Sequence, residues 1–392
     1  MRELYMGLMS GTSLDGVDGV LVEYSNLQPH GMAKDSSRVI AHAYAPFLPT
    51  LRQEFLALNT SGADEIHRAA LAGNALARIY ASVVSDLLAR AGVGKDQVTA
   101  MGAHGQTVRH RPQEFDVGNP SGGLISGGGY TVQLNNPAML AELTGIDVVA
   151  DFRSRDVAAG GQGAPLVPAF HQATFGQAHD AVAVLNIGGI SNVTLLAPLD
   201  LQPVGDVIGF DCGPGNALMD HWCQRHTGQA FDAAGQWAAS GQVSTALLMN
   251  LLDEPYFGKP PPKSTGRDLF NVPWLESKLV GFGNLAPVDV QATLTELTAS
   301  ICATCIDSHG NSRKKLIVCG GGALNTFLLK RLQAQLQKMT VTTSQAFGLP
   351  PLQVEAAAFA WLARKAIRHE TASLPKVTGA LGARILGAIY PA

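Results

Sequence analysis

The sequence predicts an α/β protein with open sheets, divided into two related halves with a ligand cleft between them. Apolar segments of strand length repeatedly run into glycine-rich turns, and several of those turns lead into helical sequence. One unit of strand, Gly/Ser turn and strand opens the chain at Met6–Glu23, and a similar unit recurs at Ala181–Leu196. A repeated unit at the start of each half indicates two lobes built on one plan.

In the first half, strand and helix signals follow the opening hairpin. Alternating apolar residues predict a strand within His30–Leu48, and apolar residues at helical spacing predict a long helix at Ala63–Ala91 that ends at Gly92. The glycine-rich Pro112–Tyr130 predicts a mobile surface loop. Shorter strands are expected at Val98–Ala103, Thr131–Leu134 and Asp147–Ala150, and shorter helices at Leu51–Leu58, Pro137–Thr144 and Leu166–Thr174.

The second half repeats this alternation. After the second hairpin, Asp206–Phe210 predicts a strand. Leu316–Val318 predicts a short buried strand that runs into the glycine-rich Cys319–Asn325, where a helix begins. Helices are expected at Ala217–Thr227, Val243–Leu252, Val288–Ser308 and Val354–Lys365. The glycine-rich break at Ala159–Pro165 suits a hinge. We therefore place lobe I at 1–160 and lobe II at 161–376, with 377–392 packing back onto lobe I.

Composition bounds the class of protein. The 392 residues are 46% hydrophobic and 15% charged, which is enough chain for two domains with sizeable cores. A formal net charge of −3, without a long basic run, argues against nucleic acid as a partner. The five scattered cysteines favour a reducing compartment over a disulfide framework. Because signal-like and membrane-spanning apolar runs are lacking in the sequence, we expect a soluble cytoplasmic protein without membrane contact.

The turn of the opening hairpin has the chemistry of a phosphate site. Gly11 lets the backbone approach an anion closely, and Ser10, Thr12 and Ser13 add hydroxyl donors. For this turn alone, an ordinary glycine turn is the more frequent case. The second hairpin carries a similar turn, with Gly188, Gly189 and Asn192. Two such turns facing each other across a cleft favour phosphate binding by both.

A triple glycine, Gly320-Gly321-Gly322, lies between a predicted strand and a predicted helix. Three glycines allow a flat ligand to lie on the backbone, and a helix N-terminus favours nearby negative charge. The pattern is not a dinucleotide-binding fingerprint. We interpret it as a contact on the adenosine side of a nucleotide, with a tight turn as the alternative.

Asp211 is the candidate catalytic carboxylate. It ends a predicted strand and is followed at once by Gly213-Pro214-Gly215, a break that directs a side chain into a cleft. A carboxylate in that position can take a proton from a hydroxyl or a water during phosphoryl transfer. The alternative is a turn-forming aspartate that bonds to its own backbone.

Polar residues at other strand and helix ends are candidates for substrate binding. Asp151 and Arg153 point the same way from one strand end, where they can hold sugar hydroxyls or a carboxylate; a structural ion pair is the alternative. His104, Gln106 and Thr107 supply donors and acceptors at another strand end, although His104 also suits a buried core position. Glu355 stands near a helix start, where a capping acid is equally natural.

Taken in order, several blocks make this sequence resemble the anhydro-N-acetylmuramic acid kinases. These are bacterial peptidoglycan-recycling enzymes in the superfamily of actin, the hexokinases and the heat-shock chaperone ATPases. The likeness covers essentially the whole chain. Its blocks are Leu8–Asp18, His104–Thr107, Asp151–Arg153, Gly160–Pro165, Asn186–Asn192, Gly209–Asn216, Lys263–Arg267, Gly320–Asn325 and Thr378–Gly382.

The resemblance implies an actin/hexokinase-like (ribonuclease H-like) architecture with an ATP and sugar cleft between the lobes. It also implies ATP-dependent, Mg²⁺-assisted conversion of 1,6-anhydro-N-acetylmuramic acid to N-acetylmuramic acid 6-phosphate, with Asp211 deprotonating the water that opens the anhydro ring. A homodimer is expected by the same analogy. The family's nucleotide loop falls on Gly11, Thr12, Ser13, Leu14, Asp15, Gly16, Val17 and Asp18.

Two departures and two rival functions stay open. An Asp usually begins each phosphate hairpin in the superfamily, but Leu8 and Asn186 stand at those places, so the sequence leaves the Mg²⁺ ligands unassigned. The first rival is a plain sugar kinase that phosphorylates a free hydroxyl. The second is a nucleotide-switched binding protein of the chaperone or filament type. Asp211 and the Asp151–Arg153 block favour an enzyme.

Overall fold

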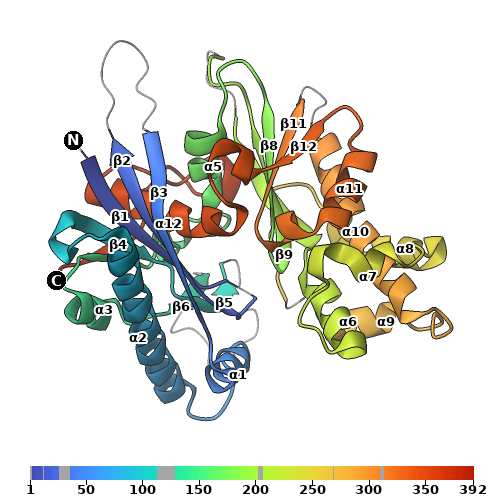
Figure 1. Cartoon of the computed structure of the whole chain (residues 1–392), viewed down its shortest axis with the longest axis horizontal. Helices are drawn as coiled ribbons and strands as arrows, with labels where there is room; N and C mark the ends of the chain where they lie inside the picture. Colours follow the sequence, from blue (N-terminus) through green and yellow to red (C-terminus); the bar gives the residue numbers. More distant parts are fainter. Residues whose placement is uncertain are drawn as a thin grey trace, which may run out of the picture. The chain divides into compact units, whose positions relative to one another are not determined.

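The computed structural model describes residues 2–11, 13–25, 36–112, 129–201, 206–267, 269–309 and 313–392. Thr12 and most of the predicted Pro112–Tyr130 loop lie outside these ranges. The chain forms two compact units (Figure 1). Unit 1 comprises Met1–Phe170 and Gln353–Ala392, and unit 2 comprises His171–Leu352.

Unit 1 is built on a six-stranded sheet in the order β13-β7-β4-β1-β2-β3. From β1 outward on one side, β2 and β3 pair antiparallel; on the other side, β4 and β7 pair parallel. β13 then closes the edge antiparallel to β7. The strands are β1 (Arg2–Met9), β2 (Gly16–Ser25), β3 (Ser36–Pro46), β4 (Val98–Ala103), β7 (Val148–Ala150) and β13 (Ala388–Tyr390).

Unit 2 repeats this plan in a five-stranded sheet with the order β10-β9-β8-β11-β12. β9 and β10 follow β8 antiparallel on one side, and β11 and β12 lie parallel on the other. The predicted α/β class with two related halves is therefore confirmed. The strands are β8 (Val182–Ile187), β9 (Ile190–Leu196), β10 (Ile208–Pro214), β11 (Lys315–Cys319) and β12 (Thr340–Thr343).

The helices of unit 1 include the long one predicted from the sequence. α2 (Glu65–Ala91) ends at Gly92, whose φ of 64° is the left-handed conformation that glycine adopts readily at a C-cap. A two-stranded sheet of β5 (Gln106–Arg111) and β6 (Tyr130–Leu134) stands apart from the main one. The other helices are α1 (Pro49–Ala57), α3 (Pro137–Thr144), α4 (Ser154–Ala158), α12 (Val354–Ile367) and α13 (Pro375–Thr378), with the 3₁₀ turn η1 (Lys95–Gln97). The helix α5 (Val167–Phe175) and the 3₁₀ turn η6 (Pro351–Gln353) each span a boundary between the two units.

The packing of α12 decides where it belongs. A Cβ at Gly7 of β1 would lie 1.8 Å from the Ala356 carbonyl oxygen, and one at Gly102 of β4 would lie 2.1 Å from that of Phe359. The helix backbone therefore contacts the sheet of unit 1 directly, which only glycine permits. The compact units change at 170 and 352, whereas the sequence analysis placed the boundaries at 160 and 376, with α12 in lobe II.

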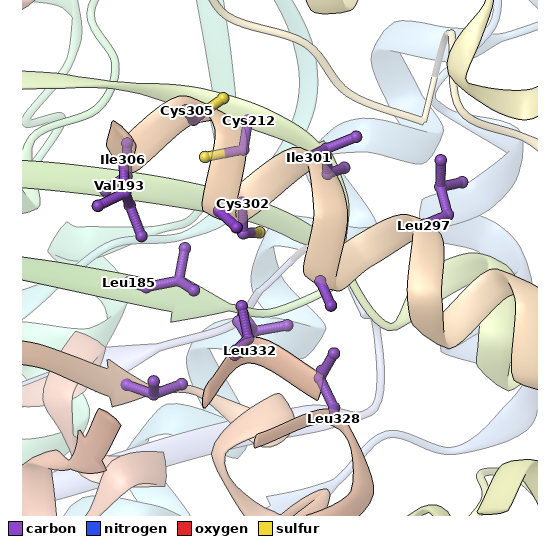
Figure 2. Packing of buried hydrophobic residues seen from close by; sticks show 14 of the residues in the cluster. Leu185, Val193, Cys212, Leu297, Ile301, Cys302, Cys305, Ile306, Leu328 and Leu332 are labelled. Atoms are coloured by element: carbon purple, nitrogen blue, oxygen red, sulfur yellow. The ribbon is translucent and has the colours of Figure 1, made fainter. Parts of the chain in front are cut away.

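The core of unit 2 forms around α10 (Pro287–Asp307), which is buried along most of its length. Figure 2 shows Ile301 and Cys302 of α10 in one cluster with Leu185 and Val193 of the sheet and with Leu332 of α11. The remaining helices are α6 (Ala217–Thr227), α7 (Gln236–Ala239), α8 (Thr245–Leu252), α9 (Val272–Lys278) and α11 (Thr326–Gln335), with the 3₁₀ turns η2 (Ala233–Gly235), η3 (Pro255–Gly258), η4 (Gly321–Leu324) and η5 (Ser344–Phe347).

The helix predicted to begin at the end of Cys319–Asn325 is confirmed. The triple glycine leads into the 3₁₀ turn η4, and α11 begins at Thr326, where the Asn325 side chain accepts a hydrogen bond from the Leu328 N–H as an N-cap. Across the described ranges, none of the helices combines the length and apolar character that a bilayer span needs.

Candidate functional site

The turn between β1 and β2 combines structural residues with one open backbone position. Leu14 is buried with φ 56°, and its N–H bonds to the Gly11 carbonyl (3.3 Å). A Cβ at Gly16 would lie 2.4 Å from the Ala45 carbonyl oxygen, so Gly16 is required by packing. At Gly11, by contrast, a Cβ would meet no atom closer than 3.7 Å. An anion can therefore approach the backbone at Gly11.

The side chains of this turn are tied to their neighbours. The Ser13 hydroxyl donates to the Asp15 carboxylate (2.7 Å), and the Asp18 carboxylate lies 3.1 Å from Nε2 of His42. Val17 is fully buried. Ser10, one of the predicted hydroxyl donors, is also buried and donates to the Gly105 carbonyl (3.0 Å). The described part of the turn therefore offers a phosphate mainly its backbone.

The His104–Thr107 block lies against this turn. The Gln106 amide donates to the Gly11 carbonyl (3.2 Å), and the Tyr80 hydroxyl accepts the Gly105 N–H (3.0 Å). Thr107, at the start of β5, accepts a hydrogen bond from Gln133 (3.3 Å). The sequence analysis named Gln106 as a hydrogen-bonding residue of this block, but it did not identify Tyr80.

The buried His104 is hydrogen-bonded to the half-buried Arg153. Arg153 donates from Nε and from one terminal nitrogen to Nε2 of His104 (3.1 and 2.9 Å), and from the other terminal nitrogen to the Gly163 carbonyl (2.7 Å). Burial, and then the Arg153 charge, lower the pKa of His104 to about 3. The imidazole is therefore neutral, and since its Nε2 accepts from Arg153, its proton lies on Nδ1. This places His104 as a residue that orients Arg153.

The predicted hinge segment and the Thr378–Gly382 block meet at Asp156. This carboxylate is fully buried, accepting the Gly163 N–H at one oxygen (2.8 Å) and the Thr378 hydroxyl at the other (2.9 Å). It thereby links the Gly160–Pro165 block to the Thr378–Gly382 block and supports the Gly163 carbonyl that holds Arg153. Asp151, two residues before Arg153, is exposed with φ 57°, and its carboxylate accepts the Ser154 hydroxyl.

In unit 2 the β8–β9 turn is joined to the loop after β10. The Gly215 and Asn216 amides donate to the carbonyls of Gly189 (2.9 Å) and Gly188 (2.8 Å). A Cβ at Gly188 would meet no atom closer than 3.6 Å, so its backbone is as open as that of Gly11. The two predicted turns therefore share an open glycine, although they sit in different units.

The triple glycine packs on the same turn. A Cβ at Gly320 would lie 2.4 Å from the Asn186 amide oxygen, and one at Gly322 would lie 2.4 Å from the Ile187 side chain. Gly321 is exposed, with its nearest potential contact at Asn216 (3.3 Å). Unit 2 thus brings Gly188, Gly189 and Gly320–Gly322 together, as a single nucleotide-contacting surface would require.

Asp211 lies half-buried on β10, directly opposite Asn192 of β9. One of its carboxylate oxygens accepts the Thr265 N–H (3.0 Å), and its own N–H donates to the Lys263 carbonyl (3.2 Å). The buried Oδ1 of Asn192 has no hydrogen-bond partner within the described ranges. Asp211 therefore bonds to a loop more than 50 residues later in the chain. The alternative from the sequence, a turn-forming aspartate, would bond to its own neighbouring backbone.

Glu355 lies half-buried in the first turn of α12, within unit 1. A metal centre made of side chains alone is not seen: the described residues contain no group of three His, Cys, Asp or Glu that could hold an ion.

Comparison with known proteins identifies the family. A family model described as anhydro-N-acetylmuramic acid kinase matches residues 3–392. The chain belongs to this family. Proteins of that name from Albidiferax ferrireducens and Variovorax paradoxus are each 62% identical to it; the first alignment covers both chains fully, and the second covers 100% of this chain and 99% of the relative. The family predicted from the sequence blocks is thereby confirmed, and with it a kinase that uses ATP.

Solved structures show more distant likeness. The activator of the 2-hydroxyisocaproyl-CoA dehydratase from Clostridium difficile, with bound ADPNP, is 12% identical with a TM-score of 0.45, covering 95% of this chain and 99% of the activator. A ROK family glucokinase from Streptomyces griseus, in complex with glucose and AMPPNP, is 15% identical with a TM-score of 0.40, covering 92% and 99%.

Membership in the anhydro-N-acetylmuramic acid kinase family changes how the rival functions stand. A nucleotide-switched chaperone or filament protein is set aside, because the family model spans nearly the whole chain and names a kinase.

Proposed function

We propose that this member of the family performs the reaction for which the family is named, with Asp211 as the general base. The enzyme would convert 1,6-anhydro-N-acetylmuramic acid, ATP and water to N-acetylmuramic acid 6-phosphate and ADP. The observation that carries the proposal is the half-buried Asp211 carboxylate, fixed through one oxygen by the Thr265 amide (3.0 Å). A base needs this kind of fixed orientation toward the proton it removes.

The proposed chemistry balances as follows. Asp211 takes a proton from a water molecule whose oxygen attacks the anomeric carbon. The bond between that carbon and the bridging O6 breaks, and its electron pair stays on O6. O6 then attacks the γ-phosphorus of ATP and ADP leaves, so the net products are a C1 hydroxyl, a 6-phosphate, ADP and a proton.

The glycine turns are the proposed nucleotide contacts. Gly11 and the rest of Gly11–Asp18 would hold phosphate in unit 1, as would Gly188, Gly189 and Asn192 in unit 2, with Gly320–Gly322 near the adenosine. The open space above Gly11 and Gly188 supports this assignment. Because the described residues offer no three-residue metal cluster, a Mg²⁺ ion would take most of its ligands from phosphate oxygens and water, and it would neutralise charge on the phosphates.

Arg153 is the proposed anchor of the sugar. Its guanidinium is oriented by neutral acceptors, His104 and the Gly163 carbonyl, and Arg is well suited to a substrate carboxylate or sugar oxygens. Asp151, Thr107 and Glu355 remain proposed substrate contacts, whereas His104 would act through Arg153. We also propose a homodimer, on family analogy alone.

The test is ADP release against a panel: anhydro-N-acetylmuramic acid, free N-acetylmuramic acid, glucose and no sugar. We expect turnover with the anhydro sugar, and turnover on free sugars alone would instead establish the plain sugar kinase.

Two further experiments test the attack by water and the base. In ¹⁸O-water the label should appear at C1 of the product. Asp211→Asn should lose about 10²- to 10⁴-fold in rate, the range of general-base contributions; near-normal turnover would place the base elsewhere.

A further inference from the structure

Tyr256 makes a contact with Asp211 that the reaction above does not use. It lies in η3, is 4% exposed, and its hydroxyl donates to the main-chain carbonyl of Asp211 (2.8 Å). We propose that Tyr256 is a positioning residue: by occupying this carbonyl, it leaves the Thr265 amide to hold the Asp211 carboxylate. The inference rests on the proposed role of Asp211 as the base.

The first step of the argument is the edge of the sheet. β10 is an edge strand: among the described residues, no strand pairs with the side of its backbone that faces away from β9. Near Asp211 the loop from Lys263 to Thr265 covers that side, and the Asp211 N–H donates to the Lys263 carbonyl (3.2 Å). In a regular parallel ladder, the amide two residues further on, that of Thr265, would return to the Asp211 carbonyl. Here it donates to the side-chain oxygen Oδ2 (3.0 Å).

The second step is the reason for this diversion. The Asp211 carbonyl already has a donor, the Tyr256 hydroxyl. A carbonyl that is shielded from water and loses its donor is costly, and in a parallel ladder the Thr265 amide would be its donor. Removing the hydroxyl would therefore draw this amide back to the main chain and away from the carboxylate.

The third step is the rigidity of the Tyr256 ring. It packs edge-on against Phe270, with ring centroids 5.8 Å apart. The ammonium of the buried Lys263 lies 4.8 Å from the ring centroid and donates to the Tyr256 carbonyl (3.4 Å). Because neighbouring residues fix both the ring and the backbone of Tyr256, they also fix the position of its hydroxyl at the Asp211 carbonyl.

The predicted consequence is a change in the pKa of Asp211. A hydrogen bond to the ionised carboxylate favours the ionised form and lowers its pKa. Tyr256→Phe withdraws that bond, so the pKa should rise. Since the base must be ionised, the acid limb of kcat/KM should move to higher pH by about one unit, the value of one hydrogen bond to a charged group.

Other titratable groups around Asp211 do not account for such a shift. Lys263 and Arg267 are the basic residues of the loop, and neither is changed in Tyr256→Phe. Burial raises the pKa of the Cys212 thiol, which therefore stays neutral there, and Cys305 of α10 contacts Cys212. Glu254 is the other carboxylate near Tyr256; it accepts the Tyr256 N–H and the Trp274 indole N–H, bonds that Tyr256→Phe keeps.

The experiment compares pH profiles of kcat/KM for the full-length enzyme, using the panel sugar that gives turnover. Tyr5→Phe is the matched control, because Tyr5 is buried in unit 1 and its hydroxyl contacts Thr99. We expect the acid limb of Tyr256→Phe to rise by about one pH unit and that of Tyr5→Phe to stay in place. A Tyr256→Phe enzyme that loses rate equally at all pH values would overturn the inference.

A second pair of variants tests the same amide if Tyr256→Phe fails to fold. Thr265→Pro removes the N–H that bonds the carboxylate, whereas Thr265→Ala keeps it. The acid limb of kcat/KM should move to higher pH in Thr265→Pro and stay at the wild-type pH in Thr265→Ala, whatever either change does to the maximal rate. Equal limbs in the two variants would contradict the inference.

Asp211→Asn separates the two proposals. If Asp211→Asn keeps normal turnover, Asp211 is not the base and both proposals are wrong. If it is inactive while the limb of Tyr256→Phe does not move, the proposed function stands and only the role of Tyr256 is wrong.

Discussion

His171 should make unit 2 sensitive to acid. It is 1% exposed, its Nδ1 lies 2.9 Å from the buried Thr194 hydroxyl, and burial lowers the pKa of the ring to about 3. The folded protein therefore binds the proton more weakly than the unfolded chain, whose histidine has a pKa of about 6.5. The stability from a neutral His171 is complete above about pH 6.5 and is lost as the pH falls toward 3.

The magnitude follows from these two pKa values. Between pH 7 and pH 5 the unfolded chain takes up most of a proton at this position while the folded chain takes up almost none. Integration gives about 2 kcal/mol lost from the free energy of unfolding. His171→Asn replaces Nδ1 with a non-titrating amide and should remove this loss.

The assay is urea unfolding of the wild type and of His171→Asn at both pH values. The difference in unfolding free energy between the two proteins should change by about 2 kcal/mol from pH 7 to pH 5. His67→Asn, at an exposed histidine of α2, is the matched control and should keep the wild-type pH dependence. Identical pH dependence of the wild type and His171→Asn would refute the reasoning.

Two further predictions concern packing and substrate binding. Gly7→Ala should destabilise the protein by about 2–4 kcal/mol in thermal or urea unfolding, because its Cβ would lie 1.8 Å from the Ala356 carbonyl oxygen. Gly283→Ala is the control, since a Cβ there has no atom within 4 Å. Equal stability of the two variants would contradict the packing of α12 on β1. Arg153→Lys should raise KM for the sugar about 10- to 100-fold while leaving KM for ATP near normal, because lysine cannot reproduce the forked bonds to His104 and Gly163. An unchanged KM for the sugar would show that Arg153 does not bind the sugar.

The sequence predicted the parts of this protein that depend on local pattern. Both hairpins, the α2 helix with Gly92 at its end, and the repeated plan follow from apolar spacing and turn glycines, which act over a few residues. The similarity of the two sheets extends further than the hairpins, since five strands of each share one order and one set of directions. A single repeated turn was enough to indicate it.

The remaining features depend on contacts between residues far apart in the chain. Asp156 bonds to Thr378, and Tyr256 bonds to Asp211; no local pattern identifies either pair. The assignment of α12 to lobe II failed for the same reason. Its apolar faces were evident, but only the glycines of β1 and β4, some 250 to 350 residues earlier, show which sheet it covers.

The division of the chain into units has a consequence for synthesis. Unit 2 is one continuous segment, His171–Leu352, so all of its residues have been synthesised before the C-terminal segment is made. Unit 1 must wait for that segment, because α12 covers its sheet and β13 closes its edge against β7. Until then the first sheet has an uncovered apolar face. Truncation just before Gln353 should therefore spare unit 2 and expose the nascent first unit to chaperones.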